Sequence, residues 1–345
     1  MKRPLGTSVG ALRVAPLLLI DLETEEGVTG RAYLFCYLPA AAPAIARMLE
    51  EALRVIKGDA VAPLAINAKL ARHFMLIGVQ GIVRMALAGI DIACWDALAL
   101  ASGLPLARFL GGSTQPIRAY NSNGLSLMPT PALVDEAHAL LDGGFRAVKL
   151  RLGYPTLQED VAAVRAVRKA LPDDVTLMAD FNQALSAAEA IRRGCALDDE
   201  GLYWIEEPVR HDDYAGCAAL ARTIATPVQI GENFSGVYSM SAALAAGACD
   251  YVMPDLERIG GVTGWQRAAG LAAASGIEMS SHLFPEVSAH LLAVTPTRHW
   301  LEYVDWASPI LAEPVRIENG MAIIPERPGN GLAWDADAVA RYRKF

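Results

Sequence analysis

The sequence contains few cysteines, and they are not arranged in pairs. Five occur among its 345 residues, and no two of them form a C-x-x-C motif. They are Cys36, Cys94, Cys195, Cys217 and Cys249. A scattered, odd-numbered set argues against both a disulfide framework and a thiolate metal site, and it predicts a cytoplasmic location.

Long apolar runs and basic clusters are also missing. No stretch approaches the roughly 20 consecutive apolar residues of a membrane-spanning helix, and the amino-terminal apolar run is only the short "APLLLI". The net charge is −8 without a basic run, which argues against a nucleic-acid surface. No Gly-rich phosphate loop occurs. These absences predict a small-molecule partner, with no membrane or nucleic acid involved.

Residues 113–309 alternate between strand-like and helix-like segments. The strand candidates are residues 116–123, 147–152, 175–181, 202–207, 227–232, 251–255, 277–282 and 299–304. Between the second and third, apolar residues at helical spacing predict an amphipathic helix over residues 157–171. Repeated βα units with eight strands predict a closed (β/α)₈ barrel, and an open doubly wound sheet is the alternative.

Residues 1–112 predict a separate α+β domain. A hairpin turning at residues 25–27 is followed by helices, including the long run that ends "GIDIACWDALALASG". The tail, residues 310–345, contains a second hairpin with its turn at Asn319–Gly320, and we expect it to pack on the first domain.

Three carboxylates stand at evenly spaced strand ends, where a barrel holds its active site. Asp180, Glu206 and Glu232 are 26 residues apart, about one βα unit. Each alone would be expected to cap the helix after its strand. As a set they would repel one another without a cation, and an all-oxygen ligand set favours Mg²⁺. Glu207 points to the face opposite Glu206, and the pattern does not choose between the two.

A histidine and a carboxylate end neighbouring strands. His282 closes the seventh strand and Asp255 the sixth, so the carboxylate is expected to fix the imidazole tautomer and make His282 a general base. The remaining histidines lack such a partner and are predicted to be core residues. They are His73, His138, His211, His290 and His299.

The first and last strands supply further polar candidates. Glu302 ends the eighth strand, where an apolar setting would keep it protonated as a hydrogen-bond donor; Asp305 is a weaker alternative. In "AYNSNG", Tyr120 and Ser122 could reach a substrate, although such a cluster is more typical of a turn.

Several segments resemble the mandelate racemase / muconate lactonizing enzyme branch of the enolase superfamily. They are "RMALAGIDIACWDAL", "FRAVKLRLGYP", "MADFNQ", "WIEEP", "PVQIGENF", "MPDLERIGGVTGW", "MSSHLFPEVSAHLLAVTPTRHWLE" and "IPERPGNG". The resemblance runs over nearly the whole chain. It implies a barrel whose mouth is covered by the amino-terminal domain, with "PLGTSVGAL" as the covering loop, and a homo-oligomer such as an octamer.

The resemblance also implies a role for each site residue. Asp180, Glu206 and Glu232 would hold Mg²⁺, which selects Glu206 over Glu207. Lys149 would bind the substrate carboxylate, Glu302 would donate to it, and Asn182 would contact the substrate. Asp255 and His282 would act as a dyad on one face of the α-carbon.

The chain departs from the family pattern in two places. Where the family has K-x-K on the second strand, this chain has Lys149 and Arg151, whose alternate positions send both cations to one face. A guanidinium keeps its proton at neutral pH, and removing it costs on the order of 8 kcal/mol, so Arg151 should be a poor base and a good donor. The strand that normally precedes the covering loop has no counterpart here, which leaves the anchoring of that loop open.

Three functions fit these observations. The first is a racemase or exchange enzyme for a 2-hydroxy acid, with His282 as the main base acting through a metal-stabilised enediolate. The second is an acid-sugar dehydratase, and the third is a non-catalytic Mg²⁺-dependent carboxylate binder. The small, apolar residues of "PLGTSVGAL" favour an apolar substrate substituent, and the His282–Asp255 pair disfavours a mere binder.

Overall fold

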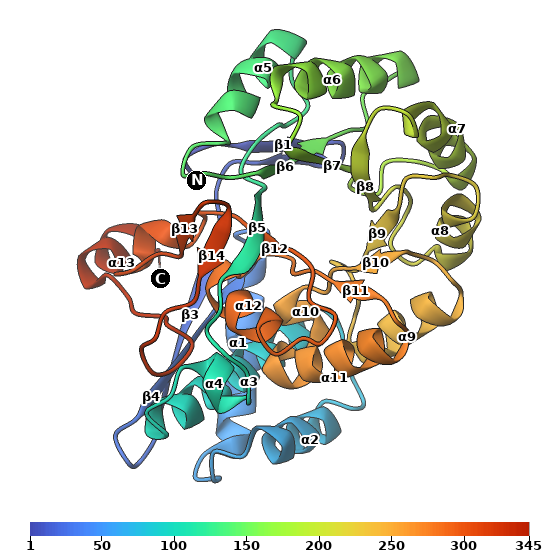
Figure 1. The fold of residues 1–345 in the computed structure, drawn as a ribbon. Coiled ribbons are helices and arrows are strands. Elements are labelled where there is room, and N and C mark those ends of the chain that lie inside the picture. The colour runs from blue at the N-terminus through green and yellow to red at the C-terminus, as the bar shows by residue number, and fades with distance from the viewer. Residues whose placement is uncertain (345) are drawn as a thin grey trace.

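The predicted strands between residues 113 and 309 close into a ring (Figure 1). The computed structural model describes residues 1–344. The strands are β5 (Ile117–Asn121), β6 (Ala147–Arg151), β7 (Thr176–Asp180), β8 (Leu202–Glu206), β9 (Val228–Ile230), β10 (Tyr251–Val252), β11 (Glu278–Met279) and β12 (Leu301–Tyr303). Successive strands from β5 to β11 pair in parallel, and β12 pairs with β5. Hydrogen bonds from Met279 N to Thr297 O (2.8 Å) and from Ser281 N to Trp300 O (2.9 Å) join β11 to β12. The closed barrel is confirmed and the open sheet is wrong.

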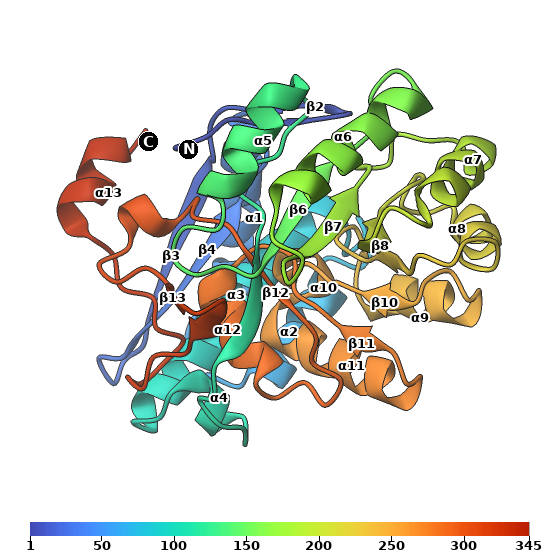
Figure 2. The ribbon, with the colours of Figure 1, turned by 45° about the horizontal axis from the view of Figure 1, so that its top comes forward.

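Helices form the outer layer of the barrel, as both views show (Figures 1 and 2). They are α5 (Thr130–Ala139), α6 (Leu157–Ala170), α7 (Ala187–Leu197), α8 (Tyr214–Ala221), α9 (Val237–Ala245), α10 (Leu256–Ile259), α11 (Gly261–Ala274) and α12 (Pro285–Leu292). The amphipathic helix predicted at 157–171 is α6. It begins with a capping box between Thr156 and Glu159, and it buries Ala163, Val164 and Val167 against the barrel.

The amino-terminal part packs across one side of the barrel. Its antiparallel hairpin is β3 (Leu17–Glu23) and β4 (Thr29–Phe35), and its helices are α1 (Ala41–Ile56), α2 (Pro63–His73), α3 (Gly81–Ala101) and α4 (Leu106–Phe109). The hairpin turn is where the sequence predicted it. Helix α3 contacts β4 on one face and α10 and α11 on another, and Asp91 accepts hydrogen bonds from the Thr263 backbone and hydroxyl.

The covering loop is itself a small hairpin, β1 (Leu5–Thr7) and β2 (Gly10–Leu12). At its tip the Ser8 hydroxyl donates to Phe181 O (2.7 Å), at the end of β7. Beside it, Gly6 N donates to Ser126 Oγ (2.8 Å) and Gly6 O accepts from Leu127 N (3.1 Å). These contacts with two barrel loops anchor the hairpin, the point that the sequence left open.

The tail differs in part from the prediction. Its hairpin, β13 (Arg316–Glu318) and β14 (Met321–Ile323), turns at Asn319–Gly320 as expected, with both residues at positive φ. However, β14 pairs with β5, so the hairpin extends the barrel wall. Only the chain beyond it reaches the amino-terminal part, where Asn330 donates to Arg31 O (2.8 Å). The tail also contains a short 3₁₀ helix, η1 (Ser308–Ile310), and ends in α13 (Ala336–Tyr342).

Two further predictions concern the burial of histidines and membrane-spanning helices. His290 and His299 are buried as predicted, but His73, His138 and His211 are exposed. The prediction is wrong for these three because a lone histidine carries no signal for which face of a helix or loop it occupies. Across residues 1–344, every helix is too short or too polar to cross a bilayer.

The close contact between β4 and α3 gives a stability prediction. A Cβ at Gly30 would lie 2.0 Å from Ala93 O, so Gly30→Ala should destabilise the protein by about 1–3 kcal/mol through overpacking. Gly270 lies exposed within α11 with nothing near its Cβ position, and Gly270→Ala should stabilise by about 0.5–1 kcal/mol. Thermal unfolding should show midpoints that move in opposite directions; equal midpoints would refute the packing argument.

Candidate active site

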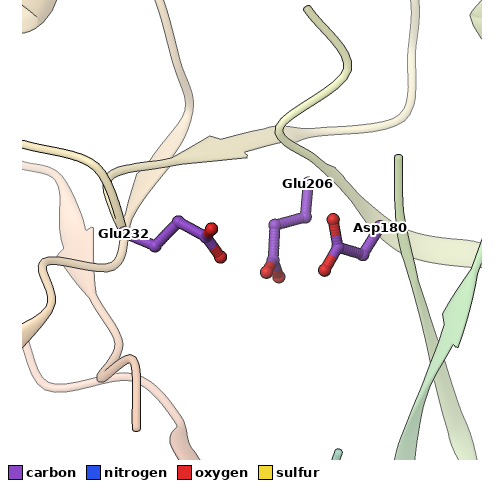
Figure 3. A group of neighbouring side chains, drawn as sticks. All are labelled: Asp180, Glu206 and Glu232. Atoms are coloured by element: carbon purple, nitrogen blue, oxygen red, sulfur yellow. The ribbon is translucent and has the colours of Figure 1, made fainter. Parts of the chain in front are cut away.

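Three carboxylates from successive strands meet at the carboxyl end of the barrel (Figure 3). Asp180 and Glu206 end β7 and β8, and Glu232 follows β9 by two residues. Each offers an oxygen within 4.8 Å of the others. Asp180 and Glu206 are buried and Glu232 is partly exposed. The convergence predicted from the even spacing is therefore found in the structure.

The chemistry of this cluster fits a hard dication. Its ligands are all carboxylate oxygens, the type that Mg²⁺ prefers. Burial, together with the charges of Asp180, Glu302 and Glu232, raises the pKa of Glu206 to about 8 even though Lys149 opposes the shift. Glu206 resists ionisation because too little positive charge surrounds the three carboxylates. A bound Mg²⁺ would supply that charge.

Glu207 is not part of this three-carboxylate cluster. It accepts from Asn233 Nδ2 at 2.8 Å, and the same amide lies 3.3 Å from Glu232 Oε1. Arg258 in turn donates to Asn233 Oδ1, and its guanidinium lies 4.4 Å from the Tyr37 ring centroid. Glu207 thus belongs to a supporting network behind the carboxylates. The sequence did not predict this network. Asn233, which directly follows Glu232, is a polar residue that could have suggested it.

Lys149 lies among the carboxylates. Its Nζ is 2.5 Å from Glu206 Oε1, 2.9 Å from Glu302 Oε1 and 3.3 Å from Asp180 Oδ2. Burial lowers the pKa of Lys149, but Glu206, Glu302 and Asp180 together raise it above its ordinary value. The ammonium therefore stays charged, and it acts as a donor rather than a base.

Arg151 lies beside the same carboxylates and is linked to Glu302 through a serine. Its Nη2 donates to Ser122 Oγ (2.9 Å), and that hydroxyl donates to Glu302 Oε1 (2.8 Å). Its Nη1 also approaches Gly124 O at 3.3 Å. Ser122 therefore links the cation on the second strand to the carboxylate on the eighth.

Without substrate, the surroundings of Glu302 favour its ionised form, and its protonation next to an anionic substrate stays a prediction. Burial would raise its pKa, but the charges of Lys149 and His282 bring it below the ordinary range. Its oxygens accept from Ser122 Oγ and from Leu283 N (2.9 Å). Glu302 is thus an ionised acceptor. The weaker candidate, Asp305, lies 3.1 Å from Lys2 Nζ instead.

His282 and Asp255 form the expected dyad. Nδ1 lies 2.7 Å from Asp255 Oδ2, while Asp255 Oδ1 accepts from the backbone N–H groups of Glu257 and Arg258. Nε2 faces the carboxylate cluster, 3.2 Å from Glu232 Oε2. Burial lowers the pKa of His282, but Glu232, Glu302 and Asp255 together raise it to about 9. Asp255 thus orients the ring and leaves Nε2 to exchange a proton.

The remaining candidates have distinct surroundings. Asn182 donates to Asp180 from its backbone (2.8 Å) and side chain (3.1 Å), and its Oδ1 has no partner among residues 1–344. Tyr120 is buried below the site, with its ring 5.6 Å from Lys149 Nζ. Asn123 N donates to Asn121 Oδ1, so the turn predicted after the first strand is present.

Two family models match the chain. Residues 1–111 match the mandelate racemase / muconate lactonizing enzyme N-terminal domain, and residues 132–338 match the enolase C-terminal domain-like family. Two solved structures share this fold. An enolase from α-proteobacterium BAL199 with bound Mg is 47% identical, with a TM-score of 0.97 over 99% of this chain and 95% of that one. An enolase from Bradyrhizobium, complexed with magnesium and mandelic acid, is 43% identical, with a TM-score of 0.96 over 100% and 95%.

Curated relatives have other named activities. A 3,6-anhydro-α-L-galactonate cycloisomerase from Streptomyces coelicolor is 32% identical over 96% of this chain and 92% of its own length. An L-talarate/galactarate dehydratase from Salmonella typhimurium is 31% identical over 93% and 81%. The relatives thus include both isomerases and dehydratases, and structural neighbours were crystallised with Mg, in agreement with the carboxylate cluster.

The choice between adjacent glutamates can be tested by metal binding. Glu206→Gln should weaken Mg²⁺ binding by about 100-fold or more because it removes a ligand, whereas Glu207→Gln alters only a supporting contact and should cost about tenfold. Isothermal titration calorimetry measures both. The assignment fails if Glu207→Gln is the more damaging change.

Proposed function

Because the chain belongs to the mandelate racemase / muconate lactonizing enzyme family of the enolase superfamily, we propose that it removes the α-proton of a 2-hydroxy carboxylate with His282 as its base. The observation that carries this proposal is the position of His282. Its Nε2 faces the carboxylate cluster while Asp255 holds the opposite ring nitrogen. Asp180, Glu206 and Glu232 would hold Mg²⁺ beside it.

The chemistry requires stabilisation of negative charge. Removing a proton next to a carboxylate gives an enediolate, and preorganised donors lower the barrier by stabilising the charge that develops. When bound, Mg²⁺ supplies positive charge against that carboxylate. Lys149 would donate to the same group, and the free Oδ1 of Asn182 would accept a substrate hydroxyl. Glu302, an ionised acceptor here, bonds the substrate carboxylate only if it takes up a proton on binding.

Arg151 serves this reaction as a fixed cation. Its guanidinium donates to Ser122 and Gly124 O, and its Nε lies 4.0 Å from Asp180 Oδ2. These acceptors hold the guanidinium in place. His282 is then the only base at the α-carbon, and proton abstraction takes place on one face. This supports slow, one-sided exchange more than efficient racemisation.

An acid-sugar dehydratase is the second candidate. It is favoured by the dehydratases among the relatives and by the one-sided base, since dehydration needs abstraction on only one face. Against it, the tip of the covering hairpin carries the apolar Val9, which is 72% exposed. This side chain offers no hydrogen bond to a polyol, which supports an aryl or alkyl substituent. A non-catalytic binder leaves the His282–Asp255 pair without a role.

Two other expectations stay predictions. The homo-oligomer implied by the resemblance can be tested by light scattering of the purified protein, and the cytoplasmic location by fractionating cells that express it.

Solvent isotope exchange tests the roles of His282 and Arg151. In D₂O with Mg²⁺, deuterium should enter one enantiomer of an accepted 2-hydroxy acid much faster than the other. His282→Asn should reduce exchange by about 100- to 10,000-fold, as expected for loss of a general base. His138→Asn, an exposed site on α5, is the control. Arg151→Lys should speed exchange on the slow face, because a lysine loses its proton far more readily. Equal exchange into both enantiomers of the wild type would contradict the proposal.

A substrate panel separates the candidate reactions. Aryl and alkyl 2-hydroxy acids should lose optical activity or exchange their α-proton, while sugar acids should give no keto-acid product. Polarimetry and a keto-acid assay read the two outcomes separately. Keto-acid formation from a sugar acid would establish the dehydratase, and inactivity on the whole panel despite Mg²⁺ binding would favour the binder.

A further inference from the structure

The two oxygens of Glu206 have different surroundings. Oε1 lies against Lys149, whereas Oε2 accepts from Trp204 Nε1 (3.1 Å) and from Gln229 Nε2 (3.3 Å). Both donors are fully buried. One carboxylate oxygen is therefore bound by two neutral N–H donors from the barrel interior, on the side away from the ammonium.

The indole is held rigidly in this position. Trp204 and Glu206 are two residues apart on β8, so both side chains point into the barrel. Tyr120 and Tyr203 pack edge-on against the Trp204 ring, with centroids 5.5 and 5.4 Å away. An aromatic ring enclosed in this way has one orientation available, and that orientation aims its only donor at Glu206.

Gln229 reaches the same oxygen from β9. Its Nε2 also approaches Met253 Sδ at 3.2 Å, and its Oε1 has no hydrogen-bond partner within residues 1–344. The opposite amide orientation would place an acceptor oxygen against the carboxylate. The bond to Glu206 therefore fixes the orientation of the Gln229 amide, even though this orientation leaves the amide oxygen without a hydrogen-bond donor.

We propose that Trp204 and Gln229 are positioning residues that hold Oε2 of Glu206 and so fix the orientation of its carboxylate at the Mg²⁺ site. The inference rests on the proposed metal site but not on the identity of the reaction. Outer partners of metal ligands typically contribute about 10- to 100-fold to metal affinity. The indole is also a reporter, because a dication at Glu206 changes the electric field at its N–H group.

Trp204→Phe removes the donor and keeps an aromatic ring. Trp265→Phe is a matched control, since Trp265 is equally buried but donates to Thr295 Oγ1 (3.0 Å), a hydroxyl of another part of the barrel. Calorimetry without substrate should show Mg²⁺ binding weakened about tenfold in Trp204→Phe and unchanged in the control. Gln229→Met, which keeps the side-chain length, should also weaken binding, and the double variant should not be additive because the two donors share one acceptor.

Fluorescence gives an independent measure. Addition of Mg²⁺ should change the tryptophan emission of the wild type and of Trp265→Phe, and the change should be absent in Trp204→Phe. Unaltered affinity in both Trp204→Phe and Gln229→Met would overturn the proposal, and so would an emission change that survives Trp204→Phe. Gln229→Met carries the affinity test if Trp204→Phe does not fold. Wild-type protein that binds no Mg²⁺ would overturn the metal site as well, whereas normal binding without turnover would count only against the proposed reaction.

Discussion

The whole site depends on concentrating negative charge where water is scarce. Asp180, Glu206, Glu232, Asp255 and Glu302 are five carboxylates at one end of the barrel. Three cationic groups oppose them: Lys149, Arg151 and protonated His282. Carboxylates outnumber cations in this set, and a divalent cation would offset the excess of negative charge. The raised pKa of Glu206 expresses the same imbalance, since burial and neighbouring charges oppose its ionisation.

The backbone is strained around this charge cluster. Non-glycine residues with positive φ include Asn182, Gln183 and Glu207, just after β7 and β8, and Leu283 and Phe284, just after His282. Such conformations cost of order 1–3 kcal/mol each and persist only where the surrounding structure enforces them. Here each one turns the chain sharply at the carboxyl end of a strand. The turn after Asp180 lets Asn182 donate back to that carboxylate, and the turn after His282 lets Leu283 N bond Glu302. Strain is thus the consequence of orienting ligands from strand ends.

The periodicity of the sequence was enough to predict the features that repeat along the chain. The even spacing of Asp180, Glu206 and Glu232 follows the length of one βα unit, so their convergence could be predicted before any contact was known. The pairing of His282 with Asp255 followed from neighbouring strand ends. Contacts between distant segments carried no such signal: Ser8 bonds Phe181 across 173 residues, and β14 joins β5. The ionisation of Glu302 depends on three charges that the fold brings together. The sequence of its own strand does not reveal these neighbours.

The arginine on β6 shows how one substitution constrains the chemistry. A lysine ammonium is a compact charge that loses its proton when it is desolvated or placed beside another cation, whereas a planar guanidinium keeps its proton and forms several directed hydrogen bonds. Arg151 fits the second description, because Ser122 and Gly124 O accept from it and Ser122 passes the contact on to Glu302. The guanidinium is therefore part of the frame that holds the eighth-strand carboxylate. In the reaction proposed above, His282 is then the base on one face, and proton delivery on the opposite face would have to come from solvent. The asymmetry of the site thus arises from the hydrogen bonding around Arg151.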